Sequence, residues 1–279
     1  MGCVSPATED PPPSVGPTRG GSAVRRKPQP FRPPSARVTL QSGVLPTNSD
    51  QRDLEYVSYV RPIDSFAGDF FEICSHSGRE TWLFLGDVTG HGPRAGMVKL
   101  MAQSMLQALV KVRPGVSPRE LNFLANKELH AKLKRLGEER YLSIVTICRR
   151  GDRILVSGSH DNMFVVRTAT DTVEEVELTH FPFGLGLIGN LELSDFTECE
   201  IALGPQDILY VGTDGVTEAA RDGDHAKGIF GDDGLKRFLG SIGHASLDEA
   251  RDDLVDRLEA HTSGHFTDDV AFVMIRPLA

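Results

Sequence analysis

The sequence predicts an α+β domain in which two mainly antiparallel sheets pack face to face and helices flank them. Many short runs rich in β-branched and aromatic residues have the length and composition of strands. Longer segments show helical spacing behind clear start signals. These helices stand in blocks between groups of strands. That order favours antiparallel sheets with helices packed outside them over a doubly wound parallel sheet.

The predicted strands are apolar runs bounded by glycine, proline or charged residues, a pattern typical of half-buried or fully buried strands. Two cysteines, Cys74 and Cys148, fall inside such runs and are expected to be small core residues. The strands are predicted over Val57–Val60, Phe70–Cys74, Trp82–Leu85, Tyr141–Cys148, Ile154–Gly158, Met163–Arg167, Phe196–Ile201, Ile208–Val211 and Val270–Ile275.

Three helices have recognisable beginnings. Pro93 suits the first position of a helix that continues over Arg94–Val110. Ser117 and Glu120 form a capping box, and the helix that they open should end at Gly137. A second capping box, from Ser246 to Glu249, opens another helix. In the first helix, core packing is the expected role of Met97, Met101 and Met105.

Composition narrows the class of protein. The chain has 279 residues, of which 39% are hydrophobic and 25% charged, as in a soluble globular domain with a tail. Its formal net charge of -9 argues against generic nucleic-acid binding. No apolar run approaches the length of a membrane span. The four cysteines are scattered without C-x-x-C spacing, which predicts reduced thiols and a cytoplasmic location.

The N-terminal part differs from the rest of the chain. Residues 1–37 contain nine of the 17 prolines and carry six basic residues against Glu9 and Asp10. Such a segment cannot bury enough apolar surface to order itself. We therefore expect a disordered Pro-rich basic arm over residues 1–37 and one globular domain over residues 38–279.

Acidic residues mark the ends of several apolar runs. A buried strand that ends in glycine and aspartate delivers a carboxylate to the rim of its sheet. Converging carboxylates repel one another unless cations neutralise them, which suggests a pair of hard divalent ions, Mg²⁺ or Mn²⁺. Such ions lower the pKa of a water molecule and offset charge on a phosphoryl group. The aspartates concerned are Asp69, Asp87, Asp214 and Asp268.

The turn D-V-T-G-H-G, residues 87–92, is the most informative of these segments. Asp87 can supply two oxygens to an ion and the Val88 carbonyl a third. Asp268 and Asp269 are adjacent, so in a strand only one of them faces the site. Histidine and cysteine do not recur at the spacing of zinc ligands, so the sequence does not favour zinc. For His91, the roles of general acid, phosphate contact, support for a ligand, and structural turn residue all stay open.

Six motifs, in this order, resemble the signatures of the SpoIIE/RsbU-type branch of the metal-dependent PPM (protein phosphatase 2C-like) serine/threonine phosphatases. V-R-P-I-D-S-F-A-G-D-F-F-E is similar to R-P-x-x-x-x-G-G-D-F-Y-D, and L-G-D-V-T-G-H-G-P-R-A-G to D-V-x-G-H-G-x-x-A-A. S-G-S-H-D-N stands where the family has A-G-H-N, and F-G-L-G where it has P-L-G-L. V-G-T-D-G-V-T-E-A is similar to S-D-G-x-x-E, and T-D-D-V-A-F-V to D-D-x-T. The likeness spans Tyr59 to Arg276; Ala67, Glu72, Gly96 and the extra Asp161 depart from it.

The resemblance implies a four-layer α-β-β-α sandwich with a two-metal centre at one end. Asp87 would bind both ions with help from the Val88 carbonyl. Asp69 would bind one ion, and Asp214 and Asp268 the other. Asp269 would support them, although it and Asp268 could exchange roles. The implied catalytic residues, acting through a metal-activated water, are Asp69 and Asp87.

The implied reaction is hydrolysis of phosphoserine or phosphothreonine on a bacterial signalling protein, typically one like an anti-anti-sigma factor. Arg61 could contact the phosphate or form a surface ion pair. Two other functions stay open: a catalytically silent interaction module of the same fold, and a metal-dependent hydrolase of a small phosphate ester. Neither the oligomeric state nor the regulator follows from the sequence.

Overall fold

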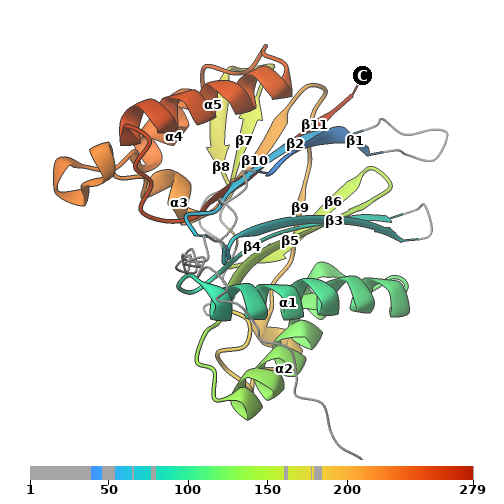
Figure 1. Cartoon of the computed structure of the whole chain (residues 1–279). Helices are drawn as coiled ribbons and strands as arrows, with labels where there is room; N and C mark the ends of the chain where they lie inside the picture. The colour runs from blue at the N-terminus through green and yellow to red at the C-terminus, as the bar shows by residue number, and fades with distance from the viewer. Residues whose placement is uncertain are drawn as a thin grey trace, which may run out of the picture. The chain divides into compact units, whose positions relative to one another are not determined.

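Two antiparallel sheets lie face to face, and helices cover the outer side of each (Figure 1). The computed structural model describes residues 39–45, 54–64, 66–76, 80–159, 163–176, 178 and 184–278. The fold class is confirmed as a four-layer α-β-β-α sandwich. Every strand pairing is antiparallel, as the grouping of strands and helices along the sequence predicts.

Among the described residues, the larger sheet has six strands and the smaller sheet five. In spatial order the larger sheet contains β1 (Thr39–Leu45), β2 (Leu54–Arg61), β11 (Val270–Pro277), β10 (Ile208–Gly212), β7 (Met163–Arg167) and β8 (Thr172–Glu175). The smaller sheet contains β3 (Phe70–His76), β4 (Glu80–Val88), β5 (Leu142–Arg150), β6 (Arg153–Gly158) and β9 (Cys199–Ile201).

Helices α1 (Pro93–Val112) and α2 (Pro118–Leu136) cover the smaller sheet, and α4 (Gly231–Leu239) and α5 (Leu247–Thr262) cover the larger one (Figure 1). Both predicted capping boxes are confirmed, because Ser117 and Ser246 each accept a hydrogen bond from the backbone of the glutamate three positions later. Gly137 ends α2 in the left-handed conformation, as expected. The short elements are α3 (Asp214–Thr217), η1 (Leu193–Asp195), η2 (Arg221–Gly223) and η3 (His225–Lys227).

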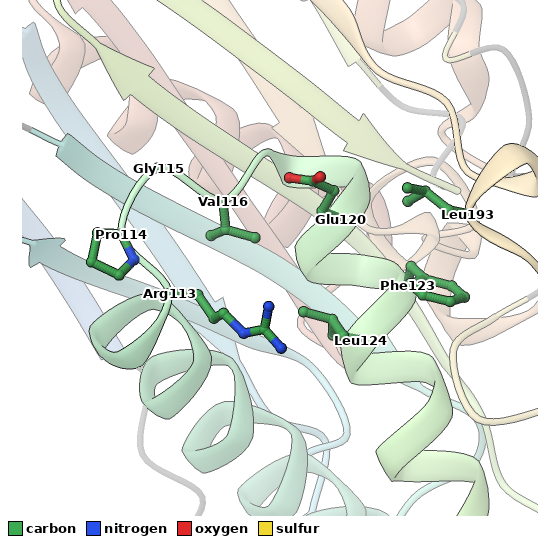
Figure 2. Close-up of a pocket in the computed structure, with 8 residues that line it drawn as sticks. All are labelled: Arg113, Pro114, Gly115, Val116, Glu120, Phe123, Leu124 and Leu193. Carbon is green, nitrogen blue, oxygen red and sulfur yellow. The ribbon is translucent and has the colours of Figure 1, made fainter.

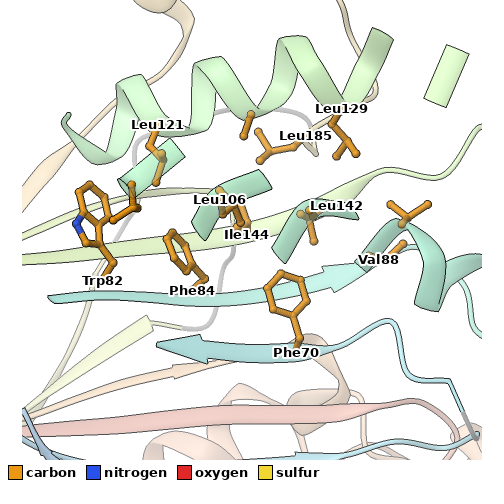
Figure 3. Close-up of a cluster of buried hydrophobic side chains, with 14 of the residues drawn as sticks. Phe70, Trp82, Phe84, Val88, Leu106, Leu121, Leu129, Leu142, Ile144 and Leu185 are labelled. Atoms are coloured by element: carbon orange, nitrogen blue, oxygen red, sulfur yellow. The ribbon is translucent and has the colours of Figure 1, made fainter. Parts of the chain in front are cut away.

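Strand β4 is buried on both faces because it lies between a helix layer and the other sheet. Trp82 and Phe84 point toward α1 and α2, whereas Leu83 and Leu85 belong to the core between the sheets. This alternation follows from the two-residue period of a strand. Figure 3 shows Trp82 and Phe84 packed below Leu106 and other helix residues. Each fully buried aromatic side chain stabilises the fold by about 1.5–3 kcal/mol.

The structure differs from the sequence prediction mainly at the sheet edges. Strands β1 and β8 were not predicted, because their polar sequences T-L-Q-S-G-V-L and T-V-E-E lack an apolar pattern. The prediction of a strand over Phe196–Ile201 is wrong for its first half, since only Cys199–Ile201 pairs with β6. In α1, Met101 and Met105 pack against the core, but Met97 is exposed, so the predicted core role fails there.

Some sequence predictions concern residues that lie outside the described part of the chain. They are the arm over residues 1–37, the segment around His160, and Phe183. The domain boundary between residues 37 and 38 therefore stays a prediction. Among the described cysteines, Cys148 is buried, and Cys74 and Cys199 are half-buried free thiols. In the part of the chain that the structure describes, no helix is long and apolar enough to span a membrane.

Candidate metal centre

Strand register brings the four predicted aspartates to one end of the sandwich. Phe70 at the start of β3 pairs with Gly86 near the end of β4, so Asp69 and Asp87 are neighbours. In the other sheet, Gly212 at the end of β10 pairs with Phe272 near the start of β11. Asp214 follows that end of β10 and Asp268 precedes that start of β11. Each sheet therefore contributes one pair of carboxylates.

The two pairs lie close enough to act on each other electrostatically. Besides burial, the negative charges of Asp214 and Asp268, at the end of the opposite sheet, raise the pKa of Asp87. Partial burial raises the pKa of Asp268, and the charges of Asp214 and Asp269 raise it further. Burial also raises the pKa of Asp214. The four predicted site aspartates thus converge, together with Asp269.

Asp69 and Asp87 are the most strongly perturbed acids of the group. Burial, followed by the charge of Asp87, raises the pKa of Asp69 well above its usual value. Burial, followed by the charge of Asp214, raises the pKa of Asp87 to about 7. The side chains of the two acids interact directly with each other. This end of the protein therefore carries more negative charge than its own cations neutralise at neutral pH.

Two glycines allow the loops that carry the acidic residues to lie in direct contact with neighbouring backbone. A Cβ atom on Gly68 would lie 2.6 Å from the carbonyl oxygen of Val88, and one on Gly215 would lie 1.8 Å from that of Asp269. Any side chain at either position would push the loops apart. The Val88 carbonyl therefore lies against the Gly68–Asp69 loop, while the Asp214 turn lies against the start of β11.

Asp269 holds a loop in place. Its Oδ1 accepts a hydrogen bond from the Ile63 N–H (2.6 Å), and its Oδ2 from those of Gly68 (2.7 Å) and Asp69 (3.4 Å). With a side chain that is 4% exposed, it is a buried acceptor for backbone donors. Asp268 instead accepts only the N–H of its neighbour Asp269 (2.8 Å) within the described residues, and it lies nearer to solvent.

Two residues that the sequence analysis did not single out position Asp69. The hydroxyl of Thr213 donates to Asp69 Oδ2 at 2.7 Å. Lys99 Nζ, from α1, donates to the backbone carbonyl oxygen of Asp69 at 3.1 Å. Burial lowers the pKa of Lys99, while the charges of Asp269 and Asp69 oppose that shift. A signal existed for Lys99, because it lies four residues after Ala95 on the helix face that packs against the sheet.

Two residues with open roles have definite positions. His91 is exposed, with Nδ1 4.0 Å from Asp64 Oδ2, and each of its four roles stays a prediction. Arg61 forms an ion pair with Glu259, and its guanidinium lies 4.1 Å from the centre of the Phe266 ring. The ion-pair alternative is therefore the one that the structure favours for Arg61.

The donor set fits hard divalent ions that keep most of their water. Within the described residues, no three histidine, cysteine or acidic side chains already form a closed ligand set for a single ion. Mg²⁺ needs no such set, because it is commonly bound by one or two carboxylates and several waters. Asp69, Asp87, Asp214 and Asp268 have raised pKa values, and they offer oxygen donors alone, which suits Mg²⁺ or Mn²⁺ better than zinc.

A separate apolar hollow lies far from these acids. Figure 2 shows Arg113, Val116, Phe123 and Leu124 around a cavity of about 300 Å³ where α1 passes into α2. The 20 residues of α1 separate it from the Asp87 turn, a rise of about 30 Å. None of the converging aspartates lines it, so the acidic end of the sandwich is the better candidate for the chemistry.

Comparison with known proteins agrees with the fold. The family model described as Stage II sporulation protein E (SpoIIE) matches residues 77–277, which is more than half of the chain. The chain belongs to this family, the SpoIIE family of PP2C-type phosphatases, and the sequence resemblance is confirmed. No curated protein sequence matches the chain.

Solved structures show the same fold at low sequence identity. The SiaA-PP2C domain of Pseudomonas aeruginosa superposes with a TM-score of 0.67 and 18% identity, over 79% of this chain and 85% of that one. The SpoIIE phosphatase domain of Bacillus subtilis, with a fragment of its regulatory domain, gives 0.61 and 19%, over 87% and 64%. RsbX in complex with magnesium gives 0.59 and 10%, over 85% and 100%.

Proposed function

We propose that the chain is a metal-dependent protein phosphatase that hydrolyses phosphoserine or phosphothreonine on a cytoplasmic signalling protein. One observation carries the proposal: carboxylates from both sheets converge at one end of the sandwich, where they raise one another's pKa values. Divalent ions would relieve this repulsion and would also attract a phosphoryl group. Membership of the SpoIIE family supports the same reaction.

Two ions, Mg²⁺ or Mn²⁺, are the proposed cofactors. Asp87 would bind both, with the Val88 carbonyl beside it; Asp69 would bind one ion, and Asp214 and Asp268 the other. When bound, the ions would supply Lewis acidity and an activated water molecule for attack on phosphorus. The fold resemblance to RsbX, which was solved with magnesium, supports an oxygen-bound ion of this kind.

The protein's own residues would keep this site preorganised. Thr213 and Lys99 hold Asp69 by its side chain and by its backbone. Asp269 holds the loop that carries Gly68 and Asp69. Because these contacts are made within the protein, the carboxylates need little reorganisation when ions and substrate bind.

The proposed substrate is a phosphorylated protein like an anti-anti-sigma factor. The family resemblance supports this choice, as does the fold shared with a Mycobacterium tuberculosis structure of RsbU and RsbW domains (TM-score 0.62, 18% identity, 88% of this chain and 60% of that one). The phosphoseryl side chain of such a protein would have to reach the acidic end of the sandwich.

Activity measurements on the purified chain test the proposal. Turnover of p-nitrophenyl phosphate and of a phosphoserine protein should require Mn²⁺ or Mg²⁺ and should stop with EDTA. Absence of any turnover with either ion would favour the silent interaction module. Hydrolysis of small metabolic phosphate esters with no action on phosphoproteins would favour the small-ester hydrolase.

A further inference from the structure

A polar hollow adjoins the turn that carries Asp87. Its volume is about 400 Å³, and its wall includes Thr89 and Gly90, which follow Asp87 by two and three positions. The opposite wall comes from the segment between α2 and β5. The complete lining is Thr89, Gly90, Arg94, Gly137, Glu138, Glu139 and Arg140.

Backbone hydrogen bonds fix the two walls to each other. The Thr89 N–H donates to the Tyr141 carbonyl oxygen at 3.0 Å, and the Tyr141 N–H donates to Thr89 Oγ1 at 3.1 Å. Arg140 immediately precedes Tyr141, so its backbone is held beside the Asp87 turn. The hollow is therefore a preformed feature next to the proposed metal centre.

The guanidinium of Arg140 is only partly paired. Its Nη1 donates to Glu138 Oε1 at 2.7 Å. Its Nε is enclosed without a hydrogen-bond partner, and Nη2 has no partner among the described residues. A Cβ atom on Gly90 would lie 3.7 Å from Nε and 3.9 Å from Nη2, so this edge of the guanidinium faces the turn. Buried guanidinium nitrogens normally have acceptors, and none of the described residues supplies one to Nε.

Arg94 brings a second guanidinium to the hollow from the first turn of α1. Its side chain is 74% exposed, and its Nη1 lies 3.9 Å from Glu138 Oε2. Glu138 is only 7% exposed and also accepts the backbone N–H groups of Glu139 and Arg140. The Glu138 carboxylate, which already accepts these backbone hydrogen bonds, thus faces both Arg94 and Arg140. The other acid of the lining, Glu139, is exposed and can turn toward solvent.

We infer that this hollow is an oxyanion subsite for the substrate, in which Arg94 and Arg140 bind the phosphoryl group or a carboxylate next to the phosphorylated residue. Guanidinium groups match the geometry and charge of both oxyanions. Arg140 offers Nη2, which has no partner among the described residues. The inference rests on the proposed function. It assigns the oxyanion contact to Arg94 and Arg140, because Arg61 is already paired with Glu259.

The variants Arg140→Gln and Arg94→Gln test the subsite, with Arg135→Gln as the matched control. Arg135 is exposed near the end of α2, bonds the Ala131 carbonyl oxygen alone among the residues that the structure describes, and does not line the hollow. KM and kcat are measured with p-nitrophenyl phosphate and with phosphoserine peptides that have acidic or neutral neighbours. Loss of a charge-assisted contact should raise KM by about tenfold or more, with kcat within about threefold.

The substrates distinguish the two oxyanions. A higher KM for every substrate indicates a phosphoryl contact, whereas a higher KM for acidic peptides alone indicates a carboxylate contact. Arg140→Lys should recover part of the loss, because it keeps the charge without the planar fork. A lower melting temperature and kcat at unchanged KM would mean that Arg140 only braces the turn, and this result overturns the inference.

A binding measurement separates the subsite from the proposed function. Line broadening of the ³¹P signal of inorganic phosphate, with Mg²⁺ present, reports binding whether or not the protein turns over. The wild type and Arg135→Gln should broaden the signal alike, and Arg140→Gln and Arg94→Gln should broaden it less. Equal broadening in all four proteins, together with an unchanged KM for the acidic peptides, rules the subsite out. If Arg140→Gln does not fold, the exposed Arg94 gives the same test.

Discussion

The Thr213 hydroxyl and the Asp69 carboxylate form a 2.7 Å hydrogen bond between residues that lie 144 positions apart in the chain. Thr213 also accepts the N–H of Ala271 in β11 at 3.0 Å, so its hydroxyl links the larger sheet to the acid at the start of β3. The geometry of the acidic end therefore depends on a neutral side chain that binds no ion itself.

Replacing Thr213 with valine should weaken metal binding. Valine keeps the shape of the side chain but removes the donor to Asp69, so the carboxylate loses an interaction that fixes its orientation. Loss of such an outer partner lowers metal affinity by about 10- to 100-fold. Calorimetric titration of the metal-free protein with Mn²⁺ measures this. Thr262→Val is the control, because its buried hydroxyl bonds, within the described part of the chain, helix carbonyls of α5 alone. An equal loss in both variants would contradict the prediction.

Asp87→Asn should remove activity and stabilise the metal-free protein. Removing the shared ligand should lower activity by more than the roughly 100-fold that is typical of losing an outer partner. The asparagine carries no charge, so the repulsion from Asp214 and Asp268 disappears. The melting temperature in EDTA at pH 7.5 should therefore exceed that of the wild type. Wild-type turnover, or a lower melting temperature with a normal fold, would contradict the assignment.

The raised pKa of Asp87 predicts how the stability of the metal-free protein depends on pH. The folded-state pKa is about 7, against 3.8 for an ordinary aspartate, so the folded protein holds more protons between these values. This contribution to stability is present below about pH 4 and is lost as pH rises through 7. In EDTA, stability relative to Asp87→Asn should therefore fall from pH 5 to pH 7.5. Urea unfolding at both pH values measures it, and saturating Mg²⁺ should abolish the fall.

Local sequence patterns predict where the strands end, but not which distant residues contact the acids at those ends. Each of the four site aspartates follows or precedes an apolar run, so its place at a sheet rim could be predicted. The family resemblance implied a supporting role for Asp269, but its partners could not be predicted, because one of them is Ile63, which lies 206 positions away. Strands β1 and β8 are edge strands whose polar sequences acquire their structure only by pairing with a neighbour.

Lys99→Met should make the protein depend more strongly on metal for its stability. Without ions, the ammonium group is the cation that faces Asp69 and Asp269, so its loss destabilises the metal-free form. With ions bound, that charge is no longer needed. The rise in melting temperature on adding Mn²⁺ should thus be larger than in the wild type. Gln103→Met is the control, since it removes an uncharged donor on the same helix, which bonds Glu72 in β3. The same rise in both variants would contradict the charge argument.

Replacing Asp269 and Asp268 one at a time separates the acid that supports the loop from the acid that binds the ions. Asp269→Asn places an amide against the N–H groups of Ile63 and Gly68, and its NH₂ group cannot accept a hydrogen bond from either donor. Leaving one buried donor unsatisfied costs about 1–3 kcal/mol, so urea unfolding in EDTA should show that loss.

Asp268→Asn should behave in the opposite way. The side chain lies nearer to solvent and within reach of the charge of Asp214, so its replacement should relieve repulsion and change metal-free stability little. Its affinity for Mn²⁺ should nevertheless fall, because an amide oxygen is a weaker ligand than a carboxylate for a hard ion. If Asp268→Asn instead loses stability while Asp269→Asn loses only metal affinity, the two acids have exchanged roles, and β11 presents the other carboxylate to the ions.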